Sequence, residues 1–349
     1  MKLRRLFSLM LCVMMIASVA SVCIINTSAA ETNTADTGAK LGNYFNVDYL
    51  EAEAQAYLNT QADMAETDLG ATYTPEKTTW RVWSPTATKV QLKLYTTGSD
   101  MESGAALIGK YEMTKDAATS VWSYTLTGDQ KNVYYTYLIT NPNGTNETFD
   151  IYAKAAGVNG DRSMVVDLDA TDPDGWDKDQ HVFPEKMTDE ALWEVHIADL
   201  TSNDNSGVDK NYQGKFLGFA EGGLTINGED GAKSVGIDYL VEQGIKAIHI
   251  QCPFDFASGD ETNPLSYNWG YDPKNYNLPE GMYSTNPYDG NVRINECKQM
   301  IQALHDAGIG VIMDVVYNHT AESENSWFNI TVPGYYYRNV RRSRTISCK

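Results

Sequence analysis

The segment VIMDVVYNHT, residues 311–320, constrains the fold of this chain more than any other stretch. Large apolar residues lie on both sides of Asp314, and this predicts a strand buried on both faces, as in a parallel sheet. A carboxylate inside such a strand costs free energy unless it is paired or takes part in function. Asp314 is therefore the first candidate for a functional group.

The preceding residues repeat a strand–helix pattern. We predict strands at 191–200, 245–254 and 311–317, and helices at 235–244 and 292–308. The order β-α-β-(long loop)-α-β predicts the opening of a parallel α/β domain. In a parallel barrel, functional groups collect where the strands end. Asp199 ends the first predicted strand, and Asp314, Asn318 and His319 end the third.

Upstream of this region the pattern alternates with a period of two. Val90, Leu92 and Leu94 alternate with more polar residues, which predicts a strand with one buried face. Short strands and turn residues continue over about a hundred residues and predict a small β-sandwich. The fold class is therefore multidomain, with an N-terminal immunoglobulin-like β-sandwich followed by the first part of a (β/α)8 TIM barrel. The predicted ranges are a polar and helical segment at 31–70 (helix 47–59), the sandwich at 71–169, a linker at 170–188 and the partial barrel at 189–337.

Residues 1–30 have the pattern of a signal peptide. A basic start is followed by an apolar stretch and then by the small residues 27–30, TSAA, which favour cleavage. The alternative is an uncleaved anchor, because about 20 apolar residues can span a bilayer. We expect a secreted, extracellular protein with no membrane contact after cleavage.

Charge and cysteine content exclude several classes of function. The formal net charge of −19 argues against a nucleic-acid partner or an anionic membrane, whereas a neutral glycan is compatible with it. Of the five cysteines, Cys12 and Cys23 would leave with the signal peptide, and the remaining Cys252, Cys297 and Cys348 are too few and too scattered for a disulfide framework or a metal cluster. Cys297 falls at helical spacing with apolar neighbours, so we expect it in the core.

The predicted loop from about 253 to 291 contains SYNWGYDPKNY at 266–276. Loops longer than about 12 residues are uncommon unless they serve a function. One interpretation is an aromatic wall for a sugar, with Asp272 available to hydrogen-bond a hydroxyl group. The other is a loop that folds on its own aromatic residues. Spacing alone does not separate the two.

Two motifs resemble a known family. DVVYNHT together with YNWGYDP is similar to the type I pullulanases, starch-debranching enzymes of glycoside hydrolase family 13. TTWRVWSPTA (78–87) and the stretch 151–168 resemble that family's N-terminal carbohydrate-binding module, family 48. The resemblance extends from about residue 41 to 337. D-x-V-x-N-H marks the whole amylase clan, and YNWGYDP is more specific to pullulanases.

The resemblance implies a role for each motif residue. His319 would hydrogen-bond the sugar at the cleavage subsite, Asp314 would hold the floor of that site, and Tyr271 would stack on the sugar ring. Asn318 would shape the same turn, and in some relatives it helps to form a calcium site; no other cofactor is required. The partner would be an α-glucan such as pullulan, starch or glycogen. From the residues alone, Asp314 could instead form an ion pair with an arginine of the barrel.

The resemblance also implies what this sequence lacks. Retaining glycosidases need two carboxyl groups about 5–5.5 Å apart, and in this family they follow later strands of the barrel. Glu322 and Glu324 are not at strand ends, so we expect no catalytic pair and an inactive chain. Residues 338–349 hold five basic and no acidic residues, and we favour an aberrant tail from a shifted reading frame or premature stop over a natural basic tail.

Two alternatives and one departure complete the sequence-based account. The chain could be a non-catalytic glycan-binding protein that acts through its sandwich. A relative acting on α-1,4 links is disfavoured by YNWGYDP. Ala198 stands where relatives usually carry arginine, a change that touches no catalytic group.

Overall fold

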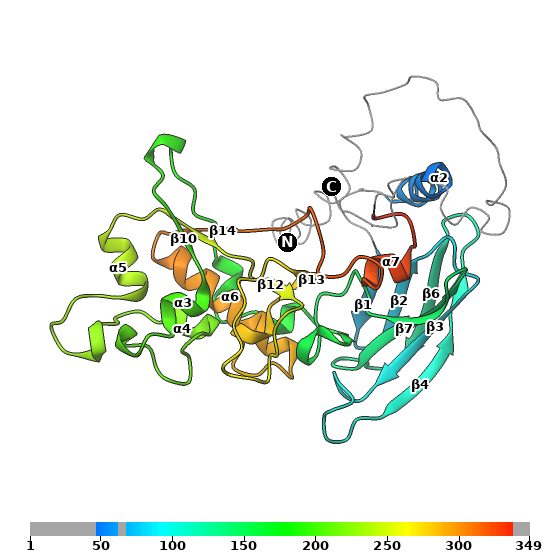
Figure 1. The fold of residues 1–349 in the computed structure, drawn as a ribbon, viewed down its shortest axis with the longest axis horizontal. Coiled ribbons are helices and arrows are strands. Elements are labelled where there is room, and N and C mark those ends of the chain that lie inside the picture. The colour runs from blue at the N-terminus through cyan, green and yellow to red at the C-terminus, as the bar shows by residue number, and fades with distance from the viewer. Residues whose placement is uncertain (1–46, 62–67, 338–349) are drawn as a thin grey trace.

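The computed structural model describes residues 47–61 and 68–337 (Figure 1). The predicted signal peptide and the basic tail lie outside these ranges. The described chain forms a β-sandwich, drawn on the right of Figure 1, and an α/β part drawn on the left. Among the described residues, no helix combines the length and the apolar character needed to cross a membrane.

The sandwich consists of two antiparallel sheets, which confirms the predicted β-sandwich. The first sheet has the order β1 (Gly70–Thr74), β2 (Lys77–Trp83), β6 (Val121–Thr127) and β5 (Thr114–Lys115). The second has the order β4 (Leu107–Glu112), β3 (Lys89–Tyr95), β7 (Tyr134–Asn141) and β8 (Gly144–Thr148), and β9 (Ser163–Met164) pairs with β7.

The alternating pattern of β3 explains how the sandwich core forms. Val90, Leu92 and Leu94 are fully buried, and the residues between them face outward. Leu92 lies opposite Tyr137 on β7, and Trp80 from the other sheet belongs to the same cluster. Because every second residue of a strand points to the same face, this period of two is sufficient to place the core.

Helix α2 (Val47–Leu58) matches the helix predicted at 47–59. Its buried residues Leu50 and Tyr57 belong to one apolar cluster with Trp83 of the sandwich. Val332, which follows helix α7 (Trp327–Thr331), belongs to the same cluster. The first described helix and the last described segment therefore meet at one side of the sandwich.

The α/β part contains a three-stranded parallel sheet in the order β10, β11, β14. Its strands are β10 (Leu192–Val195), β11 (Ala247–Ile250) and β14 (Gly310–Met313). Helix α5 (Gly236–Glu242) precedes β11, and helix α6 (Gly290–Asp306) precedes β14. This order confirms the predicted start of a parallel α/β domain.

Helix α6 packs its apolar face on the sheet. Met300 and Leu304 share a buried cluster with Ile248 and Ile250, and Cys297 lies in it as predicted. The shorter helices are α3 (Ile197–Thr201) and α4 (Phe216–Ala220), and the 3-10 turns are η3 (Val158–Gly160), η4 (Asp169–Thr171), η5 (Trp176–Lys178), η6 (Met187–Asp189), η7 (Asp204–Ser206), η8 (Ile226–Gly228) and η9 (Gly281–Tyr283).

The first parallel strand is shorter than predicted. β10 ends at Val195, and α3 occupies residues that were expected to continue the strand to 200. His196 explains the change, because its Nδ1 accepts the backbone N–H of Asp199 at 3.3 Å and caps the helix. Asp199 therefore lies in the first turn of α3 and not at the end of a strand.

The third strand is also shorter, and the prediction that it is buried on both faces is wrong. β14 ends at Met313, directly before Asp314. Val311 packs against the core below α6, whereas Ile312 and Met313 are 38% and 40% exposed. In the described ranges β14 is an edge of the sheet, so no neighbouring strand covers these side chains.

Two connecting segments have more structure than the sequence indicates. The predicted loop 253–291 contains the antiparallel pair β12 (Phe254–Phe256) and β13 (Pro273–Pro279). The predicted linker 170–188 lies along α6, where Lys298 contacts Asp172 at 2.6 Å and His305 contacts Asp179 at 2.9 Å. We call residues 170–188 the strap, because these contacts attach the segment to the α/β part and it is not a free spacer.

Candidate functional site

The candidate site lies beyond the C-terminal ends of the parallel strands. Because β10, β11 and β14 are parallel, these ends lie at one edge of the sheet. Three segments emerge there, namely α3, the β12–β13 hairpin and residues 314–320. The loop of the hairpin, residues 257–272, carries the YNWGYDP motif up to Asp272, and its Pro273 begins β13.

Gly270 brings this loop against the end of β11. Its φ is +87°, in the left-handed region that favours glycine. A Cβ atom at this position would lie 2.7 Å from Cys252 Cβ and 2.9 Å from the Cys252 carbonyl oxygen. A side chain at position 270 would therefore push the loop away from the strand end, which explains the glycine in the motif.

Tyr271 and Asp314 form the central contact of the site. The Tyr271 hydroxyl donates to Asp314 Oδ2 at 2.7 Å, which joins the hairpin loop to the end of β14. Burial, together with the hydrogen bond and the charge of Asp314, raises the pKa of the Tyr271 phenol well above its usual value. The phenol therefore stays protonated and acts as a donor at physiological pH.

The surroundings of Asp314 do not show an arginine pair. His249 Nε2 lies 3.8 Å from Asp314 Oδ1, and the Asp314 side chain is 21% exposed. Among the described residues, no arginine forms an ion pair with Asp314. The carboxylate is held by a tyrosine and remains partly open to solvent.

His319 is fixed on both ring nitrogens. Its Nε2 lies 2.7 Å from the Tyr271 carbonyl oxygen, which can only accept, so Nε2 carries the hydrogen. Its Nδ1 then accepts from the Asn318 side-chain amide at 2.8 Å. The ring is thus oriented through both nitrogens, and a sugar hydroxyl would have to replace one of these two partners.

Asp272 serves the loop itself. Its Oδ1 accepts from the Asn268 side chain at 2.7 Å and its Oδ2 from the Ser258 backbone at 2.8 Å. Its carbonyl oxygen accepts from the backbone of Ala257 at 3.0 Å. For Asp272, the structure therefore favours the interpretation of a loop that folds on its own residues.

The aromatic residues around this loop are exposed. Tyr267 and Trp269 are 52% and 58% exposed, and Tyr317, which follows β14, is 41% exposed. The Tyr267 hydroxyl donates to Asp199 Oδ2 at 2.9 Å, so α3 supports the ring. Aromatic faces with adjacent carboxylate and hydroxyl groups suit a neutral polyol, which needs stacking and hydrogen bonds but no counter-charge.

Comparison with known proteins identifies the two parts of the chain. Residues 68–153 match carbohydrate-binding module 48 (isoamylase N-terminal domain), and residues 230–337 match the alpha amylase catalytic domain. The Bacillus subtilis (strain 168) pullulanase is 38% identical over 274 residues. The chain is a pullulanase-like protein.

The solved structures agree with this assignment of a pullulanase-like protein. The Bacillus acidopullulyticus pullulanase is 43% identical with a TM-score of 0.73, covering 80% of this chain and 33% of that one. The Paenibacillus barengoltzii pullulanase, in complex with maltohexaose and alpha-cyclodextrin, is 37% identical with a TM-score of 0.75, covering 83% and 43%. The match to the Bacillus subtilis pullulanase covers 78% of this chain and 36% of that relative. The chain therefore spans about a third of the relative's length.

The site of this pullulanase-like protein brings together four of the five predicted residues. Tyr271, Asp314, Asn318 and His319 are joined by consecutive hydrogen bonds, and Asp272 faces the interior of its loop. Glu322 and Glu324 are exposed, away from any strand end.

Sequence reasoning missed His196. This buried ring accepts from Asp199, and its Nε2 lies 2.9 Å from the Asn268 carbonyl oxygen and 2.9 Å from the Tyr283 hydroxyl. It joins the end of β10 to the loop that carries the aromatic residues. The only signal was its position at the strand end, directly before the Asp199 segment.

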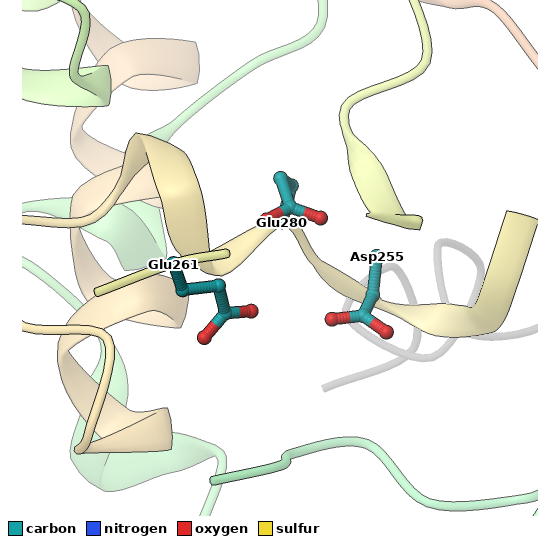
Figure 2. Close-up of side chains that lie close together, drawn as sticks. All are labelled: Asp255, Glu261 and Glu280. Carbon is teal, nitrogen blue, oxygen red and sulfur yellow. The ribbon is translucent and has the colours of Figure 1, made fainter. Parts of the chain in front are cut away.

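A metal ion fits poorly at the acidic group that the described residues bring together. One group of three acidic side chains, Asp255, Glu261 and Glu280, has carboxylate oxygens within 4.8 Å of one another (Figure 2). The guanidinium of Arg293 already lies 2.8 Å from Glu261 Oε2 and supplies positive charge there. This group is also distinct from Asn318, the residue to which the family resemblance assigned a calcium role.

Proposed function

We propose that this pullulanase-like chain is the α-glucan-binding part of a debranching glycoside hydrolase. That enzyme would act on the α-1,6 links of pullulan, amylopectin and limit dextrins. One observation carries the proposal: Tyr271, Asp314 and His319 converge at the C-terminal edge of the parallel sheet, beside exposed aromatic rings. That edge is where parallel barrels bind and transform their substrates.

The chemistry of the site suits binding better than cleavage. Retaining hydrolysis needs a carboxylate nucleophile and a carboxylic acid about 5–5.5 Å apart, with environments that separate their pKa values. Asp314 and Asp199 each accept a tyrosine hydroxyl, and Glu322 and Glu324 are exposed. We therefore assign the described residues to substrate binding and expect no turnover from the 349-residue chain.

A pair of assays tests this function. In a native gel, the chain should be retarded by pullulan and by amylopectin but not by a β-glucan of similar size. In a reducing-sugar assay with pullulan, it should release no more sugar than a boiled control. Equal migration in all three gels would contradict the proposed substrate class. Turnover that His319→Ala abolishes would contradict the assignment to binding alone.

A second candidate function is glycan binding through the sandwich without any role of the strand-end site. The match to carbohydrate-binding module 48 favours it. Tyr111 and Tyr124 stack on each other with centroids 5.0 Å apart on the sandwich, and both are partly exposed. If Tyr111→Ala abolishes retardation by amylopectin while Tyr271→Ala leaves it unchanged, this second function is the correct one.

We further propose that the protein is secreted after removal of residues 1–30. The basic start, the apolar stretch and the small residues 27–30 support this. The mass of the mature protein from culture medium checks it, and retention of residue 1 would contradict it.

No cofactor enters the proposed binding, and a calcium requirement at Asn318 stays a prediction that chelation before the gel assay would test.

A further inference from the structure

The sandwich and the α/β part meet at loop 157–161, which contains η3. Glu261 Oε2 accepts the Asn159 backbone N–H at 2.7 Å, and the Asn159 side-chain oxygen accepts the Glu261 N–H at 2.8 Å. Lys274 Nζ donates to the Asn159 carbonyl oxygen at 2.6 Å. The loop is therefore bound to residues of the β12–β13 hairpin, including the segment that follows β12.

Directly behind this loop lies the acidic group of Figure 2. The side chains of Asp255, Glu261 and Glu280 gather around one space, and all three residues are at most 8% exposed. Asp255 lies on β12, Glu261 follows β12, and Glu280 follows β13. We call these three residues the carboxyl cluster.

Arg293 of α6 is the positive partner of the carboxyl cluster. Its side chain is fully buried, with Nη2 2.8 Å from Glu261 Oε2 and Nη1 3.5 Å from Asp255 Oδ1. Nη2 also donates to the Gly157 carbonyl oxygen at 3.2 Å, so the guanidinium reaches the sandwich loop. One guanidinium against three carboxyl groups leaves two negative charges when all three are ionised.

Two lysines near the cluster also act on it through their charge, because Lys274 opposes the rise in the pKa of Asp255 and Lys215 interacts electrostatically with Glu261 and Glu280. Lys274 of β13 contacts Asp161 at 3.1 Å, and Lys215, before α4, donates to the Met282 carbonyl oxygen at 2.7 Å. Glu296 of α6 accepts from the backbone of Thr285 at 2.8 Å. Burial and the charge of Glu261 outweigh these opposing charges, because the pKa of Asp255 is still raised.

Neutral hydrogen bonds also hold the cluster. Glu280 accepts the backbone N–H groups of Met282 and Phe256 at 2.7 and 3.0 Å. Asp255 Oδ2 accepts from the Asn275 side chain at 2.7 Å. These bonds fix the positions of the carboxyl groups, so mutual repulsion cannot be relieved by rotation of a side chain into solvent.

Gly160 shows how closely the loop is seated. Its φ is +61°, and a Cβ atom there would lie 2.5 Å from Asp255 Oδ2 and 2.6 Å from the Asn275 amide nitrogen. Asn275 Nδ2 also donates to the Gly160 carbonyl oxygen at 3.3 Å. Any expansion of the cluster therefore acts directly on the loop.

We propose that this junction is a proton-dependent latch between the two parts of the chain. The junction is closed when the carboxyl cluster holds a proton. Ionisation of all three carboxyl groups sets three buried negative charges against the one guanidinium that contacts them, and the added repulsion loosens the contact of loop 157–161 with the hairpin.

The electrostatics set the pH range of the latch. Burial, followed by the charge of Glu261, raises the pKa of Asp255 to about 7, and burial with the charge of Asp255 raises the pKa of Glu280 well above its usual value. The folded chain then keeps a proton that the unfolded chain loses near pH 4. Stability therefore falls as the pH rises from about 4 towards 7, and it stays low above that range.

Urea unfolding of the whole chain at pH 6.0 to 7.5 tests the latch. In wild type, the unfolding equilibrium constant should rise with pH, by up to about tenfold per pH unit for each proton retained. In Asp255→Asn, which resembles the protonated acid, the rise should be smaller and the chain should be the more stable one at pH 7.5. A flat wild-type profile, or an unchanged slope in the variant, would overturn the proposal.

Asp161→Asn is the matched control, because Asp161 lies at the same junction but contacts Lys274 and not the cluster. It should keep the wild-type slope, and a flattened slope would assign the effect to the junction's surface charge and overturn the latch.

Hydrogen exchange of the wild-type chain tests the latch without any variant. Corrected for intrinsic rate, protection of the Asn159 amide should fall about tenfold from pH 6.0 to 7.5, relative to the Met164 amide, which donates to the Ala155 carbonyl oxygen within the sandwich. Equal changes at both amides would overturn the latch.

Discussion

At the scale of single residues, Tyr271 uses the two parts of its side chain differently. Its hydroxyl holds Asp314 across the strand ends, and its ring is partly buried and packs against the cluster that contains Cys252 and Val316. Tyr271→Phe should keep α-glucan binding within about threefold and lower stability by about 1 kcal/mol, because Asp314 loses one donor but still reaches water. Titration calorimetry and urea unfolding measure the two effects. A loss of binding as large as that of Tyr271→Ala would show that the hydroxyl, and not the ring, contacts the sugar.

Asp150 provides a pH test inside the sandwich. This fully buried carboxyl group accepts the hydroxyls of Tyr135 and Tyr137 at 2.8 and 3.2 Å and the backbone N–H of Tyr152 at 2.9 Å. Burial raises its pKa to about 6, so the folded state holds a proton that the unfolded state has lost between about pH 4 and 6.

Wild-type stability should therefore fall with rising pH relative to Asp150→Asn, which cannot titrate. The stability deficit of Asp150→Asn should shrink by about 1–3 kcal/mol between pH 4 and 6 and then stay constant. Paired urea unfolding curves at pH 4, 5, 6 and 7 check this. A deficit that grows with pH would mean that Asp150 is ionised in the fold throughout. Most of this change in stability falls between pH 4 and 6, below the range of pH 6.0 to 7.5 in which the latch is tested.

At the scale of elements, the strap 170–188 has a specific attachment to α6. The ring of His305 is almost fully buried and holds Asp179 through Nδ1 at 2.9 Å. Asp179→Ala would leave that nitrogen unpaired beside a second buried nitrogen, Nε2, which has no hydrogen-bond partner in the described structure. We expect a loss of about 1–3 kcal/mol and faster tryptic cleavage within the strap, at Lys178 or Lys186. Asp174→Ala is the control, since only its carbonyl oxygen contacts α6. Equal cleavage rates in the two variants would contradict the attachment.

Some elements could be predicted from the sequence and others could not, for local reasons. The period of two in β3 and the helical spacing around Cys297 are properties of neighbouring residues, so they identified their elements correctly. The end of β10 depends on a helix cap supplied by His196. The orientation of the Asp272 side chain depends on a hydrogen bond from the backbone of Ser258, fourteen residues earlier. The carboxyl cluster gathers residues from 255 to 280 with Arg293, so it exists only once the hairpin has folded.

At the scale of the whole molecule, the parallel sheet has exposed apolar edges. Leu192 is 57% exposed, and Ile312 and Met313 are 38% and 40% exposed, beside β10 and β14 edges that have no strand partner in the described ranges. Exposed apolar edge strands promote self-association. We expect the 349-residue chain to form dimers or larger species at micromolar concentration and its C-terminal half to be digested by protease before the sandwich.

Ile312→Lys should reduce this association, because a charged residue on an edge strand opposes pairing between chains. Sedimentation velocity over a range of concentrations measures it. Lys89→Glu, on the sandwich, is a control that should leave association unchanged. A wild-type chain that stays monomeric with a protease-resistant C-terminal half would contradict the exposed-edge account and would mean that the α/β part is stable on its own.

The central claim is that the α-glucan site lies at the ends of the parallel strands. Titration calorimetry of the chain with a maltooligosaccharide that carries one α-1,6 branch tests it most directly, with Tyr271→Ala and Tyr111→Ala measured beside wild type. Loss of the ring at position 271 should weaken binding at least about tenfold, or about 1.4 kcal/mol, while loss of the sandwich ring should leave it within about twofold. Binding that survives Tyr271→Ala unchanged would contradict the claim.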